Sequence, residues 1–205
     1  MATIDELMRI APVIPVIVIE DEAHAVPLAE ALVAGGLPVL EVTLRTPAAL
    51  PAITAMKQVP GAIVGAGTVT GPAELDAALD AGSEFVVAPG LTEPLGKAAI
   101  ASGVPFLPGI ANAGDIMRGL DMGLTRFKFF PAMAAGGLPA LKALAAPFGQ
   151  CRFCPTGGIG PENAADWLAF DPVLCVGGSW VAPKGAPDPA AIRAMAHAAA
   201  ALRRA

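Results

Sequence analysis

The sequence predicts an α/β fold of the (β/α)8 type, in which eight parallel strands close into a TIM barrel inside a ring of helices. Short runs rich in β-branched and aromatic residues alternate with longer segments rich in Ala and Leu. The runs begin 20 to 26 residues apart, and a strand of about 5 residues, a helix of about 11 and two loops of about 4–6 sum to about 25. Eight such units fill the 205 residues, which favours a closed barrel. An open flavodoxin-like sheet is the structural alternative.

We expect one domain over residues 1–205, because this length suits one substantial core and no linker or low-complexity block interrupts the chain. The expected strands are 13–19, 39–44, 62–65, 85–88, 106–110, 126–130, 152–156 and 173–176. The first of them is apolar at every position. Such a continuous apolar run is typical of a parallel strand that helices cover.

Helix signals fall between these strands. Residues Thr3 to Glu6 read Thr-Ile-Asp-Glu, a capping-box pattern that predicts a short extra helix before the first strand. Pro72 and Pro161 each follow a glycine, and we expect both in a first helical turn, where proline is tolerated. Glycines with a positive φ are expected just past helix ends, at Gly35, Gly82, Gly103 and Gly123.

The composition excludes several classes of protein. Hydrophobic residues make up 55% of the chain and charged residues 15%, too apolar for a disordered protein. The net charge of −5 and the lack of a basic run argue against a nucleic-acid partner. The longest apolar run, 12–19, is too short to span a membrane, and no basic leader is visible. Three cysteines indicate a reducing, cytoplasmic setting, and the few charges leave apolar surface that hints at an oligomer.

Two charged residues fall where the barrel interior is expected. Alternate strand residues point into that interior. Glu41 is expected there, with Thr43 and Arg45 on the same face of its strand. Lys128, which is flanked by phenylalanines, is expected there as well. A buried lysine tends to lose its charge, and the free amine attacks carbonyl groups. Glu41 could then transfer protons for it. A structural Lys–Glu ion pair is the alternative. Arg126, two residues before Lys128, is expected to form a structural ion pair.

Glycine pairs follow the last two expected strands, at Gly157-Gly158 and Gly177-Gly178. Barrel enzymes bind phosphate at these two loops through bare backbone N–H groups, so the pairs predict a phosphate site. Gly65-Ala66-Gly67 resembles part of a dinucleotide fingerprint, but the third glycine is missing, and we reject that interpretation.

The sequence offers few metal ligands. His24 and His197 are its two histidines, and both fall in expected helices, so a zinc site of several histidines cannot be assembled. Cys151 and Cys154 are three residues apart on an expected strand, where they face opposite sides. We expect them, like Cys175, to be buried packing residues. The chemistry is therefore assigned to Lys, Glu, Arg, Thr and the backbone, with no metal and no cofactor.

These residues lie in motifs by which the chain resembles the 2-keto-3-deoxy-6-phosphogluconate (KDPG) aldolase and 4-hydroxy-2-oxoglutarate (KHG) aldolase family. The matching segments cover nearly the whole chain, at residues 32–36, 40–46, 64–69, 89–92, 108–110, 127–132, 153–159 and 177–180. The resemblance implies a (β/α)8 barrel, a cytoplasmic homotrimer and a metal-free class I aldolase. Its expected reaction cleaves KDPG to pyruvate and D-glyceraldehyde 3-phosphate in the Entner–Doudoroff pathway, with a side activity on 4-hydroxy-2-oxoglutarate.

The resemblance also implies roles for individual residues. Lys128 matches the Schiff-base lysine, and Glu41 matches the general acid/base. Substrate-binding and phosphate-binding positions match as follows: Arg45 and Thr68 for the carboxylate, Thr156 for substrate hydroxyls, and Gly157, Gly158, Gly178 and Ser179 for the phosphate. Ala111-Asn112 and Met133 depart from the family pattern, which leaves the fine substrate preference open.

Two other function classes remain open on the residues alone. A sugar-phosphate isomerase or epimerase would use pairs of carboxylates, but Glu20 and Glu41 are essentially the only acids at strand ends. A binding protein without activity would keep the phosphate glycines and would need no buried lysine.

Overall fold

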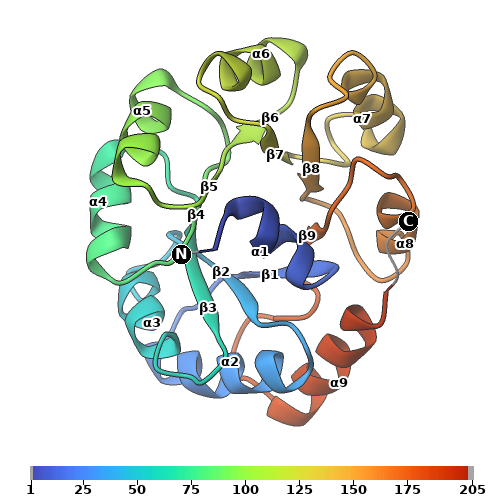
Figure 1. Ribbon diagram of the computed structural model, residues 1–205. Coiled ribbons are helices and arrows are strands. Elements are labelled where there is room, and N and C mark those ends of the chain that lie inside the picture. Colours follow the sequence, from blue (N-terminus) through green and yellow to red (C-terminus); the bar gives the residue numbers. More distant parts are fainter. Residues whose placement is uncertain (1, 203–205) are drawn as a thin grey trace.

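The computed structural model describes residues 2–202 of the chain, which form two parallel sheets surrounded by helices (Figure 1). The six-stranded sheet has the order β5-β4-β3-β2-β1-β9, and the three-stranded sheet has the order β6-β7-β8. The strands are β1 (Val13–Ile17), β2 (Val39–Thr43), β3 (Ile63–Gly67), β4 (Val86–Val87), β5 (Phe106–Leu107), β6 (Gly109–Ile110), β7 (Arg126–Phe129), β8 (Arg152–Pro155) and β9 (Val176–Gly178).

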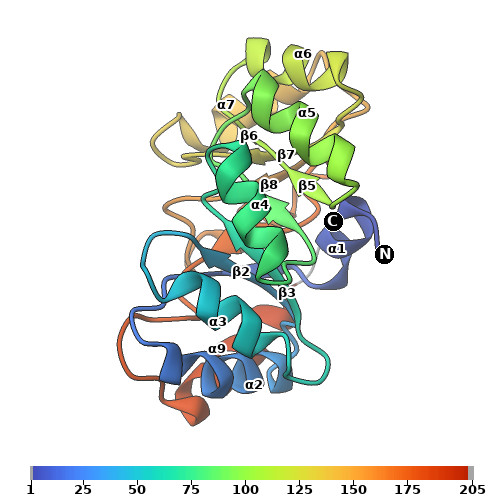
Figure 2. The ribbon, with the colours of Figure 1, turned by 90° about the vertical axis from the view of Figure 1, so that its left-hand side faces the viewer.

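The helices lie outside the strands, except for one (Figures 1 and 2). They are α1 (Ile4–Ile10), the 3-10 helix η1 (Glu22–His24), α2 (Ala25–Ala34), α3 (Ala49–Met56), α4 (Pro72–Asp80), α5 (Glu93–Ser102), α6 (Ala113–Asp121), α7 (Gly137–Ala145), α8 (Ala164–Leu168) and α9 (Pro189–Ala200). The exception is α1, which lies over the centre of the molecule in Figure 1. Among residues 2–202, no helix has the length and apolar character needed to cross a membrane.

The prediction of a closed eight-stranded TIM barrel is wrong. The six-stranded sheet is a parallel half-barrel, and the expected fifth strand divides at Pro108 into β5, which pairs with β4, and β6, which pairs with β7. Proline has no N–H and cannot donate to a ladder, so the chain passes from one sheet to the other at this residue. The flavodoxin-like alternative is not found either, because β1 to β5 are neighbours in chain order.

The expected eighth strand is also displaced. Val173 forms only an isolated bridge with Phe153, and β9, which pairs with β1, begins three residues later at Val176. A second isolated bridge joins Thr156 to Gly177. Single bridges, rather than a continuous ladder, therefore join β8 to the segment that contains β9.

The glycine and proline signals at helix ends are confirmed in part. Gly82, Gly103 and Gly123 have a positive φ, and Pro72 opens α4. Gly35 has a φ of −82°. A Cβ there would lie 2.4 Å from Cβ of Ala196, so this glycine permits α2 and α9 to approach closely. The expectation for Pro161 is wrong, because α8 begins only at Ala164.

The short N-terminal helix is confirmed. Thr3 and Glu6 form the reciprocal capping box, and Leu7 and Met8 of α1 are buried in one cluster with residues of β1, β2 and β4. Asp5 on α1 binds Nε of Arg126 at 2.5 Å and Nε of Arg9 at 2.7 Å. The expected structural ion pair of Arg126 is therefore confirmed, and it holds α1 against the start of β7.

Asp5→Asn is expected to weaken the acid dependence of stability. The hydrogen bond from Arg9, and less strongly that from Arg126, hold the pKa of Asp5 below its ordinary value against the opposing effect of burial. A carboxylate whose pKa is lowered by folding stabilises the protein above its unfolded pKa, and the effect disappears as pH falls through the folded pKa. Since the pair is partly exposed, we expect a loss below about 1 kcal/mol at pH 7.

Urea unfolding at pH 7 and near pH 3 measures this difference. The two proteins are expected to converge in stability at the lower pH. Asp76→Asn on α4 is the control, because Asp76 forms no ion pair within the described chain, and an equal pH response in both variants contradicts the assignment.

Candidate active site

Lys128 and Glu41, which come from different sheets, meet in the interior of the molecule. Lys128 lies on β7 and Glu41 on β2, and Nζ of Lys128 is 2.9 Å from Oε1 of Glu41. Both residues are buried, with 5% and 3% of their surface exposed. The Lys128 ammonium also lies 5.5 Å from the centre of the Phe130 ring. The contact between Lys128 and Glu41 is a buried ion pair that joins the two sheets.

A cavity of about 120 Å³ opens onto this pair. Its walls are Val16, Glu41, Thr43, Arg45, Thr68, Pro89, Lys128, Phe130 and Thr156. The hydroxyl of Thr43 donates to the carbonyl of Ile17 at 2.8 Å, and this bond joins β2 to β1 below the cavity. Arg45 follows the end of β2 and is exposed. Its guanidinium forms no hydrogen bond or ion pair with residues 2–202 and is available to a ligand.

Thr68 lines the cavity and has a strained backbone conformation. Its φ is +61°, and no other non-glycine residue in the described chain has a positive φ. A β-branched side chain is rarely found there, and such strain costs about 1–3 kcal/mol. Hydrogen bonds on both sides hold the segment, since the carbonyl of Gly67 accepts from Leu44 and the N–H of Val69 donates to Val87. Strain held in this way is common at binding sites.

A second cavity, of about 140 Å³, adjoins the first. It is lined by Val16, Val18, Arg45, Phe130, Thr156, Gly157, Gly158, Ile159, Gly177 and Ser179. The φ angles of Gly157 and Gly158 are +105° and +73°, which turns the backbone of this loop in a way that other residues rarely adopt. Four residues line both cavities: Val16, Arg45, Phe130 and Thr156. The two cavities therefore form one elongated site.

The structure brings eight of the nine predicted site residues to this site, and Gly178 lies apart. Gly177 lines the second cavity in its place, whereas a Cβ on Gly178 would lie 1.8 Å from the ring of Trp180. Successive residues of β9 face opposite sides of the sheet, so only one of the two glycines can face the cavity. The sequence did not show which one, because β9 begins three residues later than the expected strand.

Sequence reasoning also missed apolar residues that line the site, among them Val16, Pro89 and Phe130. Phe130 shares the parity of Lys128, so alternation along the strand could have identified it. Val16 could not be found in this way, because its strand is apolar on both faces.

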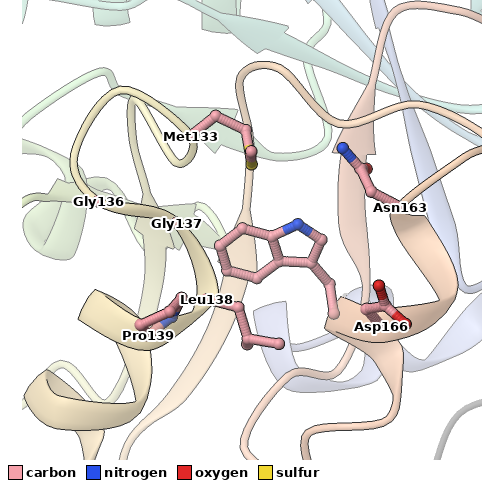
Figure 3. Close-up of a pocket in the computed structure, with 8 residues that line it drawn as sticks. Met133, Gly136, Gly137, Leu138, Pro139, Asn163 and Asp166 are labelled. Carbon is pink, nitrogen blue, oxygen red and sulfur yellow. The ribbon is translucent and has the colours of Figure 1, made fainter.

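A larger cavity, of about 490 Å³, is lined by different kinds of residue (Figure 3). Met133 lies on one side of it, and Asn163 and Asp166 lie on the other, beside the start of α8. The side chain of Asn163 accepts a hydrogen bond from the N–H of Gly160 and donates one to the carbonyl of Gly158. It therefore stabilises the glycine loop. No lysine, histidine or cysteine lines this cavity, and we do not assign the chemistry to it.

The histidines and cysteines line neither site cavity, although Sγ of Cys154 lies 3.9 Å from Oγ1 of Thr156, which lines both. His24 ends η1 and His197 is exposed on α9. The three cysteines are buried, as expected, and burial raises the pKa of the Cys151 thiol, which makes it less reactive. Between residues 2 and 202, no three His, Cys, Asp or Glu side chains are grouped so that they could hold a metal ion.

Comparison with known proteins gives a consistent result over nearly the whole chain. A family model described as KDPG and KHG aldolase matches residues 4–195. The 2-dehydro-3-deoxy-phosphogluconate aldolase of Zymomonas mobilis is 63% identical over 205 residues, which are 100% of this chain and 99% of the relative. The KHG/KDPG aldolase of Escherichia coli is 56% identical over 183 residues, 89% of this chain and 86% of the relative.

Solved structures agree in fold with this chain. The KDPG aldolase of Zymomonas mobilis with 3-phosphoglycerate aligns with a TM-score of 0.97 at 63% identity, covering 98% of this chain and 97% of the other. The KDPG aldolase of Legionella pneumophila, with pyruvate captured as a covalent carbinolamine, aligns with a TM-score of 0.94 at 44% identity, covering 98% and 99%.

Proposed function

The chain belongs to the family of KDPG and KHG aldolases, and we propose that it cleaves KDPG to pyruvate and D-glyceraldehyde 3-phosphate through a Schiff base on Lys128. It is thus an aldehyde-lyase of the class I type, and the resemblance identified from the sequence motifs is confirmed. The observation that carries the proposal is the buried contact of 2.9 Å between Lys128 and Glu41 at the base of a cavity.

The two joined cavities suit the two ends of this substrate. The keto-acid end is assigned to the cavity with Lys128, where Arg45 and Thr68 face the carboxylate. The phosphate is assigned to the cavity with Gly157, Gly158 and Ser179. Thr156 lies at the junction of the two, where the substrate hydroxyls would pass. The ligands of the two solved relatives, pyruvate and 3-phosphoglycerate, are of these two chemical kinds.

The reaction begins with the Lys128 amine, which becomes available when its proton moves to the carboxylate of Glu41. Nζ attacks the C2 ketone of the substrate to give a carbinolamine. Glu41 then returns its proton to the departing hydroxyl group, so that water leaves and an iminium ion forms beside the Glu41 carboxylate. The Phe130 ring lies close enough to Nζ to stabilise this cation by a cation–π interaction. The buried surroundings exclude bulk water, and charge interactions are stronger there.

The iminium ion then accepts the electron pair of the C3–C4 bond. The C4 hydroxyl loses its proton to Glu41, through a water molecule, and the new carbonyl leaves as glyceraldehyde 3-phosphate. The remaining enamine is protonated at C3, with Glu41 now acting as the acid. Hydrolysis of the iminium ion releases pyruvate and restores the Lys128 amine.

Rates on three substrates test the proposed specificity. We propose that KDPG is cleaved fastest, since its phosphate fits the glycine loop and its hydroxyls fit Thr156. The galactonate epimer differs at one hydroxyl, and 4-hydroxy-2-oxoglutarate lacks the phosphate, so both are expected to have lower kcat/KM. Equal kcat/KM on all three contradicts the assignment of the second cavity to phosphate.

Arg45→Lys is expected to raise KM for KDPG about tenfold although it keeps the charge. The guanidinium can form two parallel hydrogen bonds with a carboxylate, and an ammonium cannot. Arg45 lines both cavities, so the test needs pyruvate, which has no phosphate. If Arg45 binds the carboxylate, the variant needs a higher pyruvate concentration for half-maximal formation of the trapped Schiff base. An unchanged pyruvate dependence would show that Arg45 serves the phosphate.

The homotrimer and the cytoplasmic location implied by the family resemblance are part of the proposal. Exposed large hydrophobic residues support an assembly of copies, since Met117 and Met133 have 57% and 48% of their surface exposed. Such apolar surface is often covered by a second chain.

A further inference from the structure

Gly67, at the end of β3, lies directly against the carboxylate of Glu41. A Cβ built on Gly67 would be 2.3 Å from Oε1, 2.6 Å from Cγ and 2.9 Å from Cδ of Glu41. Real Cβ contacts essentially never fall below 3.0 Å. Oε1 is also the atom that Nζ of Lys128 contacts at 2.9 Å. The absent side chain of residue 67 therefore leaves the space in which the reactive oxygen lies.

The backbone at Gly67 does not require a glycine, and its nearest neighbour is the Glu41 side chain. Its φ does not lie in the left-handed region, where only glycine is unstrained, and all three atoms nearest to the built Cβ belong to Glu41. Gly65, two residues earlier on the same face of β3, is different: a Cβ there would lie 2.5 Å from the ring and the carbonyl of the core residue Phe85. Gly65 serves packing against Phe85, whereas the nearest neighbour of Gly67 is the Glu41 side chain.

The carboxylate has little else to hold it. Among residues 2–202, Lys128 donates the one hydrogen bond that the carboxylate of Glu41 receives. That donor changes during the proposed reaction, when Nζ becomes part of the Schiff base. The space at Gly67 belongs to the backbone of β3, which no step of the proposed reaction alters. Glu41 is also a long side chain, so its carboxylate can move away from a methyl group without a shift of the backbone.

We propose that Gly67 is a positioning residue, which acts on the reaction through Glu41 by leaving the space for its carboxylate. This inference rests on the proposed function, because it assumes that Glu41 transfers protons next to a Schiff base on Lys128. Gly67 itself supplies no group that bonds to the substrate or transfers a proton. Any side chain at this position displaces Oε1 from Nζ while the fold and the rest of the cavity are kept.

Gly67→Ala is expected to lower kcat for KDPG cleavage about 10²-fold, the size of loss that a displacement of about 1 Å produces. KM is expected to change less than about threefold, since Arg45 and the glycine loop are untouched. The exchange of the pyruvate methyl hydrogens with deuterium, followed by NMR, reports proton transfer at C3 and is expected to slow by the same factor. Gly71→Ala is the matched control, because a Cβ at Gly71 meets nothing within 4 Å.

The decisive test combines Gly67→Ala with Glu41→Ala. Once the carboxylate is removed, nothing remains for the new methyl group to displace, so the double variant is expected to match Glu41→Ala within about twofold in the exchange rate. A loss that is equally large in both backgrounds overturns the inference, because Gly67 would then act through the sheet or through its strained neighbour Thr68. An unchanged kcat in Gly67→Ala overturns it as well.

Trapping with pyruvate and borohydride separates this inference from the function on which it rests. Gly67→Ala is expected to form the reduced adduct on Lys128. Normal trapping together with equal losses in the two backgrounds contradicts the inference alone. A failure of trapping in the unsubstituted chain contradicts the proposed function and the inference with it.

Discussion

Lys128→Ala is expected to lower the turnover of KDPG by at least about 10⁴-fold, since removal of a covalent nucleophile has effects of this size or larger. Within the part of the chain that the structure describes, Lys128 is the one buried lysine, so no second amine can replace it. Lys142→Ala is the control: Nζ of Lys142 also lies near an aromatic ring, 5.7 Å from the centre of Phe170, but Lys142 is exposed and lies outside the site. Stopped turnover in both variants contradicts the assignment.

The stability of Lys128→Ala must be measured beside its activity. Glu41 loses its hydrogen-bond donor in this variant, and a buried carboxylate without a partner is destabilising, by about 3–5 kcal/mol when it stays charged. Circular dichroism is expected to show a folded protein at 25 °C with a lower melting temperature. The loss of turnover is then chemical and does not result from unfolding.

Glu41→Gln is expected to lower kcat about 10²- to 10⁴-fold, the range for loss of a general acid/base. The amide keeps the shape of the carboxylate but cannot accept the C4 proton. Since Lys128 remains, slow formation of the Schiff base is expected to continue, so that the reduced pyruvate adduct still accumulates. Loss of turnover with normal trapping separates proton transfer from nucleophilic attack.

Glu84→Gln is the control for this variant. Glu84 is a partly buried carboxylate that accepts a hydrogen bond from the N–H of Val64, and it is expected to have full activity when changed to Gln. Wild-type kcat in Glu41→Gln would show that the Lys–Glu contact is only a structural ion pair.

The buried pair of Lys128 and Glu41 was the most predictable part of the molecule. A lysine between phenylalanines and a glutamate in an apolar strand conflict with burial, and function commonly explains such a conflict. The residues in which strand alternation was regular, Glu41, Thr43 and Arg45, all line the cavity as expected. The burial of these residues and the distance between Glu41 and Lys128 depend on how the two sheets face each other. Local sequence patterns do not contain this information.

The wrong predictions lie at prolines and glycines, because the structural effect of these residues depends on the sheet around them. Pro108 lies in the middle of the expected strand 106–110. Because it has no N–H to donate, this segment forms two short strands, β5 and β6, in different sheets. Gly177 and Gly178 are equivalent in sequence, and only the register of β9 against β1 shows which one faces the cavity. The positive φ of Thr68 opposes the preference of its residue type, so no propensity could have indicated it.

Reductive trapping followed by mass analysis tests the central claim most directly. The protein is incubated with pyruvate, reduced with borohydride and digested, and the peptide that contains Lys128 is weighed. We predict one reduced pyruvyl group per chain, attached to Lys128, and none in Lys128→Ala. An unmodified Lys128, or an adduct on another lysine, would contradict the account.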